Sequence, residues 1–562
     1  AGSGAAVVDA FASLSTVDLK VQDDLTVTDD ATIGGTLGVT GVLTGTSLDI
    51  SGDIDVDGTT ETDALTINGS ALNYKAFGTS SIMFGDNATG TIDAANYNTG
   101  VGVDVFAALT TGDENTAIGY ASLDALTTGA NNTAVGSDAL GVNSTGSENV
   151  AVGKAALDAN TTASNNIAVG SNALGANSTG ASNVAVGSSA LAANTTAASN
   201  VAIGAFSLDA NTTGAGNTAV GTNSLTANTT ASNNVAFGSG ALEANTTGAN
   251  NVAVGTAALD ANTTAASNTA VGYNALTENT TGAQNTAIGR NALDANTTAG
   301  NNVAVGYEAM TANTTGTANV TVGAHSMQAN TTASNNTAVG YFSLAANTTG
   351  AYNVAVGTNA LKANTTAGTN TAVGYAVGED ITTGAGNTGL GYYAMGNTTT
   401  AGSNTAIGYT ALYTNTTGAN NTVVGHNALS ANTTANSNTA VGSAALQNNS
   451  TGENNTSVGY IAGLAHTTGS RNTCVGGNAG SGITTGNDNT IVGRASGDAL
   501  TTGSQNCAFG TNLAFSAVGG NNQIVMGQGV TCSGNSNFTF GDGSVDSNIA
   551  FGATTITAPS DI

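Results

Sequence analysis

The sequence has few of the residues on which enzymes and nucleic-acid-binding proteins depend. It contains no tryptophan, one proline and three histidines, and Lys plus Arg number 7 against 35 for Asp plus Glu. Only 7% of the residues are charged, whereas an average soluble protein has about 25%. The formal net charge of −28 predicts no binding to nucleic acid or to anionic membrane surfaces, because both need clustered cations. We therefore expect neither an enzyme nor a catalytic residue.

Metal sites, disulfides and membrane spans are also poorly supported. Cys474, Cys507 and Cys532 stand far apart with no CxxC pair, which predicts small buried thiols rather than a zinc site or a disulfide framework. No apolar run approaches the roughly 18 residues of a membrane span, so we expect no membrane insertion, no metal and no cofactor. The residues from Ala1 onward contain no basic or long apolar leader, and we expect any signal peptide to be absent or already removed.

The chain is instead rich in glycine, asparagine and threonine, arranged in a repeat. A glycine recurs every 17 residues from Gly85 to Gly527, giving 27 consecutive units. Residues 149–165 show one unit, NVAVGKAALDANTTASN. Counting the glycine as position 0, position −1 is always apolar, position −3 is Val, Ile or Thr except at Cys507, and position −4 is nearly always Asn. Such repetition is the signature of a stacked repeat architecture.

Each unit reads as one rung of a β-solenoid. The N-[VT]-A-[VI]-G segment predicts a short β-branched strand that ends where glycine permits a turn. A leucine or methionine usually stands at position +4, and the NTT, NST and TTG clusters are typical of turns. One unit cannot bury its own apolar face, so it must stack on its neighbours. The fold prediction is an all-β, parallel β-solenoid or β-roll of about 27 rungs, with an Asn ladder, in a rod of roughly 130 Å.

Both faces of the predicted strand are apolar, which indicates assembly. Positions −3 and −1 point one way, and the alanine usual at −2, such as Ala117 or Ala134, points the other. Strands that are apolar on both faces are normally buried on both. We expect one face to fill the solenoid and the stripe of small residues to pack against another chain, giving a homo-oligomer and, specifically, a homotrimer.

Position +1, unlike the apolar strand positions, carries many polar, charged and aromatic residues. It carries three of the seven cationic residues of the chain and eight tyrosines, so the sequence predicts a solvent-facing column. Tyr375, Tyr392 and Tyr409 fall on successive rungs and should stack as an exposed aromatic ladder. Exposed aromatics contact sugars or partner surfaces, which makes these residues a candidate surface-contact column; the alternative is a column that only stabilises the rod.

The remaining segments differ from the repeat. Residues 1–18 are small and weakly apolar, as in a cap or attachment segment, and residues 19–76 contain short alternating Val, Ile, Leu and Thr runs that predict a β-rich shaft. The repeat would occupy 77–528. Glycine replaces the usual leucine at Gly378, Gly463, Gly480 and Gly497, which suggests a weakening register before the solenoid ends within 529–562.

The repeat resembles two groups of proteins. Its strand is similar to that in the β-roll heads of trimeric autotransporter adhesins. Residues 285–300 (NTAIGRNALDANTTAG) and 404–418 (NTAIGYTALYTNTTG) resemble more closely the arrays of bacteriophage tail fibres, and residues 32–50 resemble fibre-shaft sequence. This resemblance implies a trimeric rod in the virion tail, joined to other tail proteins through its N-terminus and directed at a glycan or protein of the host surface.

The end of the sequence adds to that resemblance. In phage fibres with an endosialidase-type intramolecular chaperone, the chaperone opens with a Ser-Asp segment and cuts itself off before that serine. Here Ser560 and Asp561 match the opening, which implies that Ser560 marks the self-cleavage junction and that the chaperone has been removed. No catalytic lysine follows it, so the resemblance implies no protease activity in this chain.

The leading functional hypothesis is a structural, extracellular tail fibre that contributes to host attachment through many weak contacts. Bacterial cell-surface adhesins and extracellular filaments without a receptor are the alternatives. An ice-binding solenoid is a weaker one, because adjacent threonines such as Thr161 and Thr162 should point apart and make a poor flat array.

Overall fold

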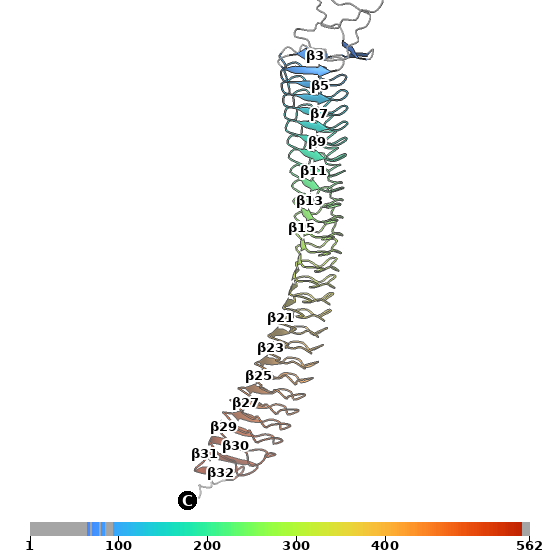
Figure 1. Cartoon of the computed structure of the whole chain (residues 1–562). Coiled ribbons are helices and arrows are strands. Elements are labelled where there is room, and N and C mark those ends of the chain that lie inside the picture. Colours follow the sequence, from blue (N-terminus) through green and yellow to red (C-terminus); the bar gives the residue numbers. More distant parts are fainter. Residues whose placement is uncertain (1–64, 68–69, 73, 78–79, 85–93, 554–562) are drawn as a thin grey trace, which may run out of the picture. The chain divides into compact units, whose positions relative to one another are not determined.

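A computed structural model describes residues 65–67, 70–72, 74–77, 80–84 and 94–553 of the chain. These residues form a β-solenoid whose rungs stack in chain order (Figure 1). No helix long and apolar enough to cross a bilayer occurs in this part of the chain. The predicted attachment segment, most of the predicted shaft and Ser560 lie outside the described residues.

Most of the strands have three residues and follow one another at the interval of the repeat. They are β1 (Leu65–Ile67), β2 (Ser70–Leu72), β3 (Tyr74–Phe77), β4 (Ser81–Phe84), β5 (Thr99–Val101), β6 (Thr116–Ile118), β7 (Thr133–Val135), β8 (Val150–Val152), β9 (Ile167–Val169), β10 (Val184–Val186), β11 (Val201–Ile203), β12 (Thr218–Val220), β13 (Val235–Phe237), β14 (Val252–Val254), β15 (Thr269–Val271), β16 (Thr286–Ile288), β17 (Val303–Val305), β18 (Val320–Val322), β19 (Thr337–Val339), β20 (Val354–Val356), β21 (Thr371–Val373), β22 (Thr388–Leu390), β23 (Thr405–Ile407), β24 (Thr422–Val424), β25 (Thr439–Val441), β26 (Thr456–Val458), β27 (Thr473–Val475), β28 (Thr490–Val492), β29 (Cys507–Thr511), β30 (Ile524–Gln528), β31 (Asn537–Gly541) and β32 (Asp546–Ala550).

These strands form one parallel ladder with antiparallel ends. From β4 to β29 each strand pairs with the residues 17 positions further along, as in Val252↔Thr269, and β30 pairs with β31 at a shorter spacing. β3 pairs with β4 in antiparallel orientation, and so does β32 with β31. The predicted parallel solenoid is confirmed, and a hairpin ends the parallel stacking on each side. β1 and β2 form a separate antiparallel pair.

The interior of a rung holds small residues from the strand and large ones from the opposite turn. The alanines at position −2 are fully buried, as are the leucines at position +4, for example Ala253 and Leu259. The expectation that the alanine stripe faces another chain is therefore wrong. Alternation alone does not say which apolar face turns inward; a narrow rung takes leucine from one side and leaves room only for alanine on the other, because interiors are close-packed.

The outer face of the strands is uncharged along its whole length, with apolar residues at position −1 and Val, Ile, Thr or Cys at position −3. Positions −3 and −1 of β5–β30 carry no charged residue, and side chains such as Ile288 and Val322 are 40% and 39% exposed. Cys507 stands at position −3 and is only half-buried, whereas Cys474 and Cys532 are buried as predicted. The β-branched stripe, and not the alanines, is thus the face open to another molecule.

Two asparagine ladders hold neighbouring rungs together. In the predicted ladder at position −4, Asn251 Oδ1 accepts the backbone N–H of Asn268 at 2.9 Å, and its Nδ2 donates to the Ala265 carbonyl at 2.9 Å. A second ladder at position +7 was not predicted: Asn262 Nδ2 donates to Asn245 Oδ1 at 2.8 Å and to the same Ala265 carbonyl at 3.0 Å. The two side-chain amides of a rung therefore satisfy buried backbone groups such as the Asn268 N–H and the Ala265 carbonyl.

The glycine at position 0 is required by both its backbone and its contacts. Gly255 has φ of +138°, and a Cβ added to it would lie 2.4 Å from the carbonyl oxygen of Gly272 in the next rung. The leucine at +4 is also left-handed, with φ of 55° at Leu259. A non-glycine residue in this conformation costs about 1–2 kcal/mol, which burial of the leucine side chain offsets.

The four rungs with glycine at +4 keep the 17-residue pairing register. The prediction that the register weakens at these rungs is therefore wrong. In each of them the residue at +7 changes as well, from asparagine to Ile381, His466, Ile483 or Leu500. A Cβ on Gly378 would lie 2.7 Å from Ile381 Cδ1, and one on Gly463 would lie 2.9 Å from His466 Nδ1. The +7 side chain thus fills the space that leucine occupies elsewhere, and the strands remain paired across these rungs.

Candidate contact surfaces on the turn side

Position +1 lies just past the strand and faces solvent, as the sequence predicts. Tyr375, Tyr392 and Tyr409 are 42%, 43% and 50% exposed. Their ring centroids are 5.2 Å apart at interplanar angles of 13° and 6°. His426 extends the ladder by a further 5.2 Å step at 13°. The predicted aromatic ladder therefore exists, with one more ring than expected.

Stacking determines what the ladder presents to solvent. Interior ring faces cover one another, so a partner meets ring edges and hydroxyl groups. Tyr393, at position +2, lies edge-on to Tyr375 and Tyr392 at 5.4 and 4.8 Å. The hydrogen bond with Tyr375 and burial raise the pKa of Tyr393 to about 12, so its hydroxyl stays protonated at neutral pH. This surface is suited to hydrogen bonding at its edge more than to ring-face stacking.

A second aromatic group occupies positions +1 and +2 of earlier rungs, and it was not predicted. The Arg290 guanidinium carbon is 5.9 Å from the ring centroid of Tyr273 and 5.7 Å from that of Tyr307, which are cation–π distances. Two rungs on, His325 stacks on Phe342 at 4.9 Å and 10°. Contacts between residues 17 positions apart can be predicted from the sequence once the rungs are known to stack. Contacts between a residue at +1 and one at +2 cannot, because they depend on the geometry of the turn.

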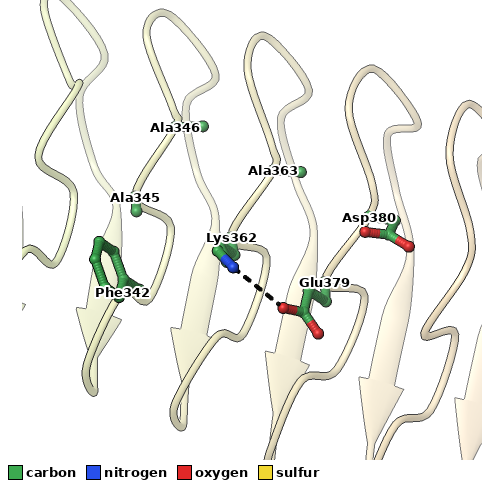
Figure 2. Close-up of a pocket in the computed structure, with 7 residues that line it drawn as sticks. All are labelled: Phe342, Ala345, Ala346, Lys362, Ala363, Glu379 and Asp380. Carbon is green, nitrogen blue, oxygen red and sulfur yellow. Dashed lines mark hydrogen bonds and ion pairs between the residues drawn. The ribbon is translucent and has the colours of Figure 1, made fainter.

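A groove lies on the turn side beside this aromatic group. Its volume is about 440 Å³, and it is lined by Phe342, Ala345, Ala346, Lys362, Ala363, Glu379 and Asp380. Figure 2 shows that these residues come from three successive rungs, with the phenyl ring at one end and the charged groups at the other. Lys362 Nζ lies 3.4 Å from Glu379 Oε1. No residue of this groove was singled out in the sequence.

The turn side is acidic. Position +5 often carries aspartate or glutamate, and partial burial raises the pKa of Asp260, with Glu243 and Glu278 raising it further. Burial and Glu278 likewise raise the pKa of Asp294. Carboxylates in one column repel one another and repel anions, so this side of the solenoid disfavours anionic ligands.

Two of the titratable side chains are buried and neutral at pH 7. His466 is buried, and desolvation lowers its pKa to about 4, so it is neutral, while its Nδ1 lies 2.9 Å from the Gly463 carbonyl oxygen. Burial raises the pKa of the Cys474 thiol to about 12. No group of three or more His, Cys, Asp or Glu is placed to hold a metal ion in that part of the chain.

No known protein family, curated protein or solved structure matches the chain. Its function is therefore argued from the repeat and from the surfaces that the solenoid exposes.

The paired threonines diverge, as expected. Thr161 Oγ1 donates to the Ser178 carbonyl in the next rung at 3.2 Å, whereas Thr162 is exposed. Each rung thus offers solvent one such hydroxyl, in single file. The Asn-Thr-Thr glycosylation sequence at Asn160 is not accessible in the folded chain, because Asn160 is buried and its Nδ2 donates to Asn143 Oδ1 at 2.9 Å.

Proposed function

We propose that this chain is the rod of a bacteriophage tail fibre, a homotrimer that links the virion to the host surface and contributes to attachment. The observation that carries the proposal is the uncharged, β-branched outer face of the strands, which continues over the whole ladder. A continuous row of exposed apolar side chains at position −1 favours a cover, and another chain with the same rung spacing matches it rung by rung. The phage assignment itself rests on the similarity of the repeat to tail-fibre arrays.

The trimer places each outer strand face against the other two chains and leaves the turn sides outward. Residues 1–18 would join other tail proteins, and the turn sides would contact a glycan or protein of the host. Cleavage before Ser560 would release the chaperone after assembly. The terminal hairpins favour this discrete rod over an endless filament, because parallel stacking stops at β3 and β32.

Sedimentation equilibrium of the full chain tests the assembly, with three times the monomer mass of 53.9 kDa as the expected result. A variant with Val254→Asp and Val271→Asp places charges on the outer strand face and should dissociate. Its matched control, Thr256→Asp with Tyr273→Asp, adds the same charges at position +1 of the same rungs and should remain trimeric. A monomeric wild-type chain, or equal behaviour of both variants, would overturn the proposal.

Cys507 supplies an independent probe of the same face. A short bifunctional maleimide should link its thiols between chains, while Cys474 and Cys532 stay unreactive because they are buried. The Cys507→Ser chain should give no links. Free alkylation of Cys507 without any cross-linking would argue against contact at this face, and end-to-end polymers would favour the filament alternative.

A further inference from the structure

The groove between Phe342 and Asp380 has an origin in the local sequence. In many rungs position +5 carries an acidic side chain, but here it is Ala345, which lies beside the alanines usual at position +6, Ala346 and Ala363, along the floor. These methyl groups leave a hollow on the turn side, bounded by an aromatic ring at one end and carboxylates at the other (Figure 2). The groove faces away from the outer strand face, so a trimer packed through its strands leaves it open.

The walls of the groove are held in place. His325 stacks on one face of Phe342 at 4.9 Å, and Tyr341 meets the same ring edge-on at 4.3 Å. Lys362 and Glu379 fix each other through their ion pair. Asp380 is exposed and makes no ion pair with any described residue, so its carboxylate remains available as an acceptor. A ligand would therefore meet a largely preformed site, which reduces the ordering cost of binding.

An apolar floor with a few convergent polar groups is the usual composition of a small-molecule site. One ammonium and two carboxylates give the groove a net negative charge. Anionic sugars and phosphates are therefore disfavoured. A pyranose ring suits the arrangement: its apolar C–H face packs on Phe342 and the alanine methyls, its hydroxyls donate to Glu379 and Asp380, and Lys362 donates to a ring or hydroxyl oxygen in charge-assisted bonds.

We propose that this groove binds an uncharged pyranose of a surface glycan. The inference rests on the proposed attachment function and names its ligand class and site. One groove gives an affinity on the order of 1 mM, equivalent to about −4 kcal/mol. Three grooves on one fibre, and many fibres on one particle, convert such contacts into stable attachment by avidity.

Saturation-transfer NMR on the full chain tests the groove with the methyl glycosides of glucose, galactose, mannose and N-acetylglucosamine as probes. At least one should receive saturation, and its signal should be lost in Phe342→Ala, while its affinity should fall about fivefold in Asp380→Asn, because the amide oxygen still accepts a hydrogen bond but lacks the charge of the carboxylate. Phe206→Ala is the matched control. Phe206 is likewise a phenylalanine at position +2, with φ of 58° against 53° for Phe342, but it does not line this groove, and its replacement should leave binding unchanged.

Each result separates the site from the wider function. Binding that survives Phe342→Ala, or no response from any of the four probes, would overturn the groove proposal. A trimeric chain without pyranose binding would refute the groove and leave the fibre proposal standing. A monomeric chain whose pyranose binding requires Phe342 would refute the trimeric fibre and leave the groove proposal standing.

Discussion

Replacing one ladder asparagine should open the solenoid locally. In Asn251→Ala the buried backbone N–H of Asn268 loses its acceptor, while the Ala265 carbonyl keeps its bond from Asn262. Leaving the buried N–H without an acceptor costs about 1–3 kcal/mol, and losing the bond from Asn251 Nδ2 to the Ala265 carbonyl costs about 1 kcal/mol more. Local stability should therefore fall by about 2–4 kcal/mol, which corresponds to about 30- to 1000-fold faster amide exchange.

Hydrogen exchange measured by mass spectrometry on peptides that cover residues 251–275 checks this value in the full chain. Because each rung contacts only its neighbours, faster exchange should stay within a few rungs of the change. Thr264→Ala is the control, since Thr264 is exposed and only one residue from Ala265. Equal exchange in the two variants, or a loss of protection along the whole solenoid, would refute the assignment of rung-to-rung stability to the amide ladders.

Three further changes test other parts of the rung. Gly255→Ala should disrupt stacking and expose the neighbouring turns to protease, because its Cβ would lie 2.4 Å from a carbonyl oxygen, whereas Gly477→Ala, with no atom within 4 Å, should be neutral. The pKa of His466 is about 4 in the fold, against its ordinary value of 6.5. The neutral imidazole therefore contributes about 3 kcal/mol to the free energy of unfolding above pH 6.5, and this contribution is lost as the pH falls to 4. His466→Asn should remove that part of the pH dependence from thermal melts. Tyr392→Ala should lower local stability by about 1–2 kcal/mol through its two stacked contacts, while Tyr460→Ala, on an exposed ring, should leave exchange unchanged.

The sequence was sufficient for features that follow from the period alone. A glycine every 17 residues implies stacked rungs, and the ladder of Asn251 and the stacking of Tyr375 on Tyr392 follow directly, because equal positions on successive rungs become neighbours. The second ladder was missed because Asn262 lies in an NTT segment, whose local turn chemistry gives sufficient reason for an asparagine. Its burial depends on how the turn folds back over the core.

Two other features needed the packed structure. Alanine and valine are both apolar, so the alternation around Ala253 did not decide which face turns inward; the width of the rung did. The groove depends on side chains from different columns, with Phe342 at position +2 and Glu379 at position +5. Stacking by the repeat brings equal columns together, but the approach of unequal columns is determined by the turn between Gly340 and the next strand.

The 27 units also serve as a comparison within one molecule, which connects the two proposals. At positions +1, +2 and +5 the exposed residue changes freely from rung to rung, as expected for a surface that each rung uses separately. At positions −3 and −1 the residues are partly or well exposed, yet no charged residue occurs there from β5 to β30. The folding of a single chain does not require such uniformity on its surface, since exposed substitutions usually change stability by less than about 0.5 kcal/mol. A second chain that meets every rung does require it. The uniform face is therefore where we place the assembly contact, and the variable turn side is where one rung, such as that of Phe342, can acquire a site of its own.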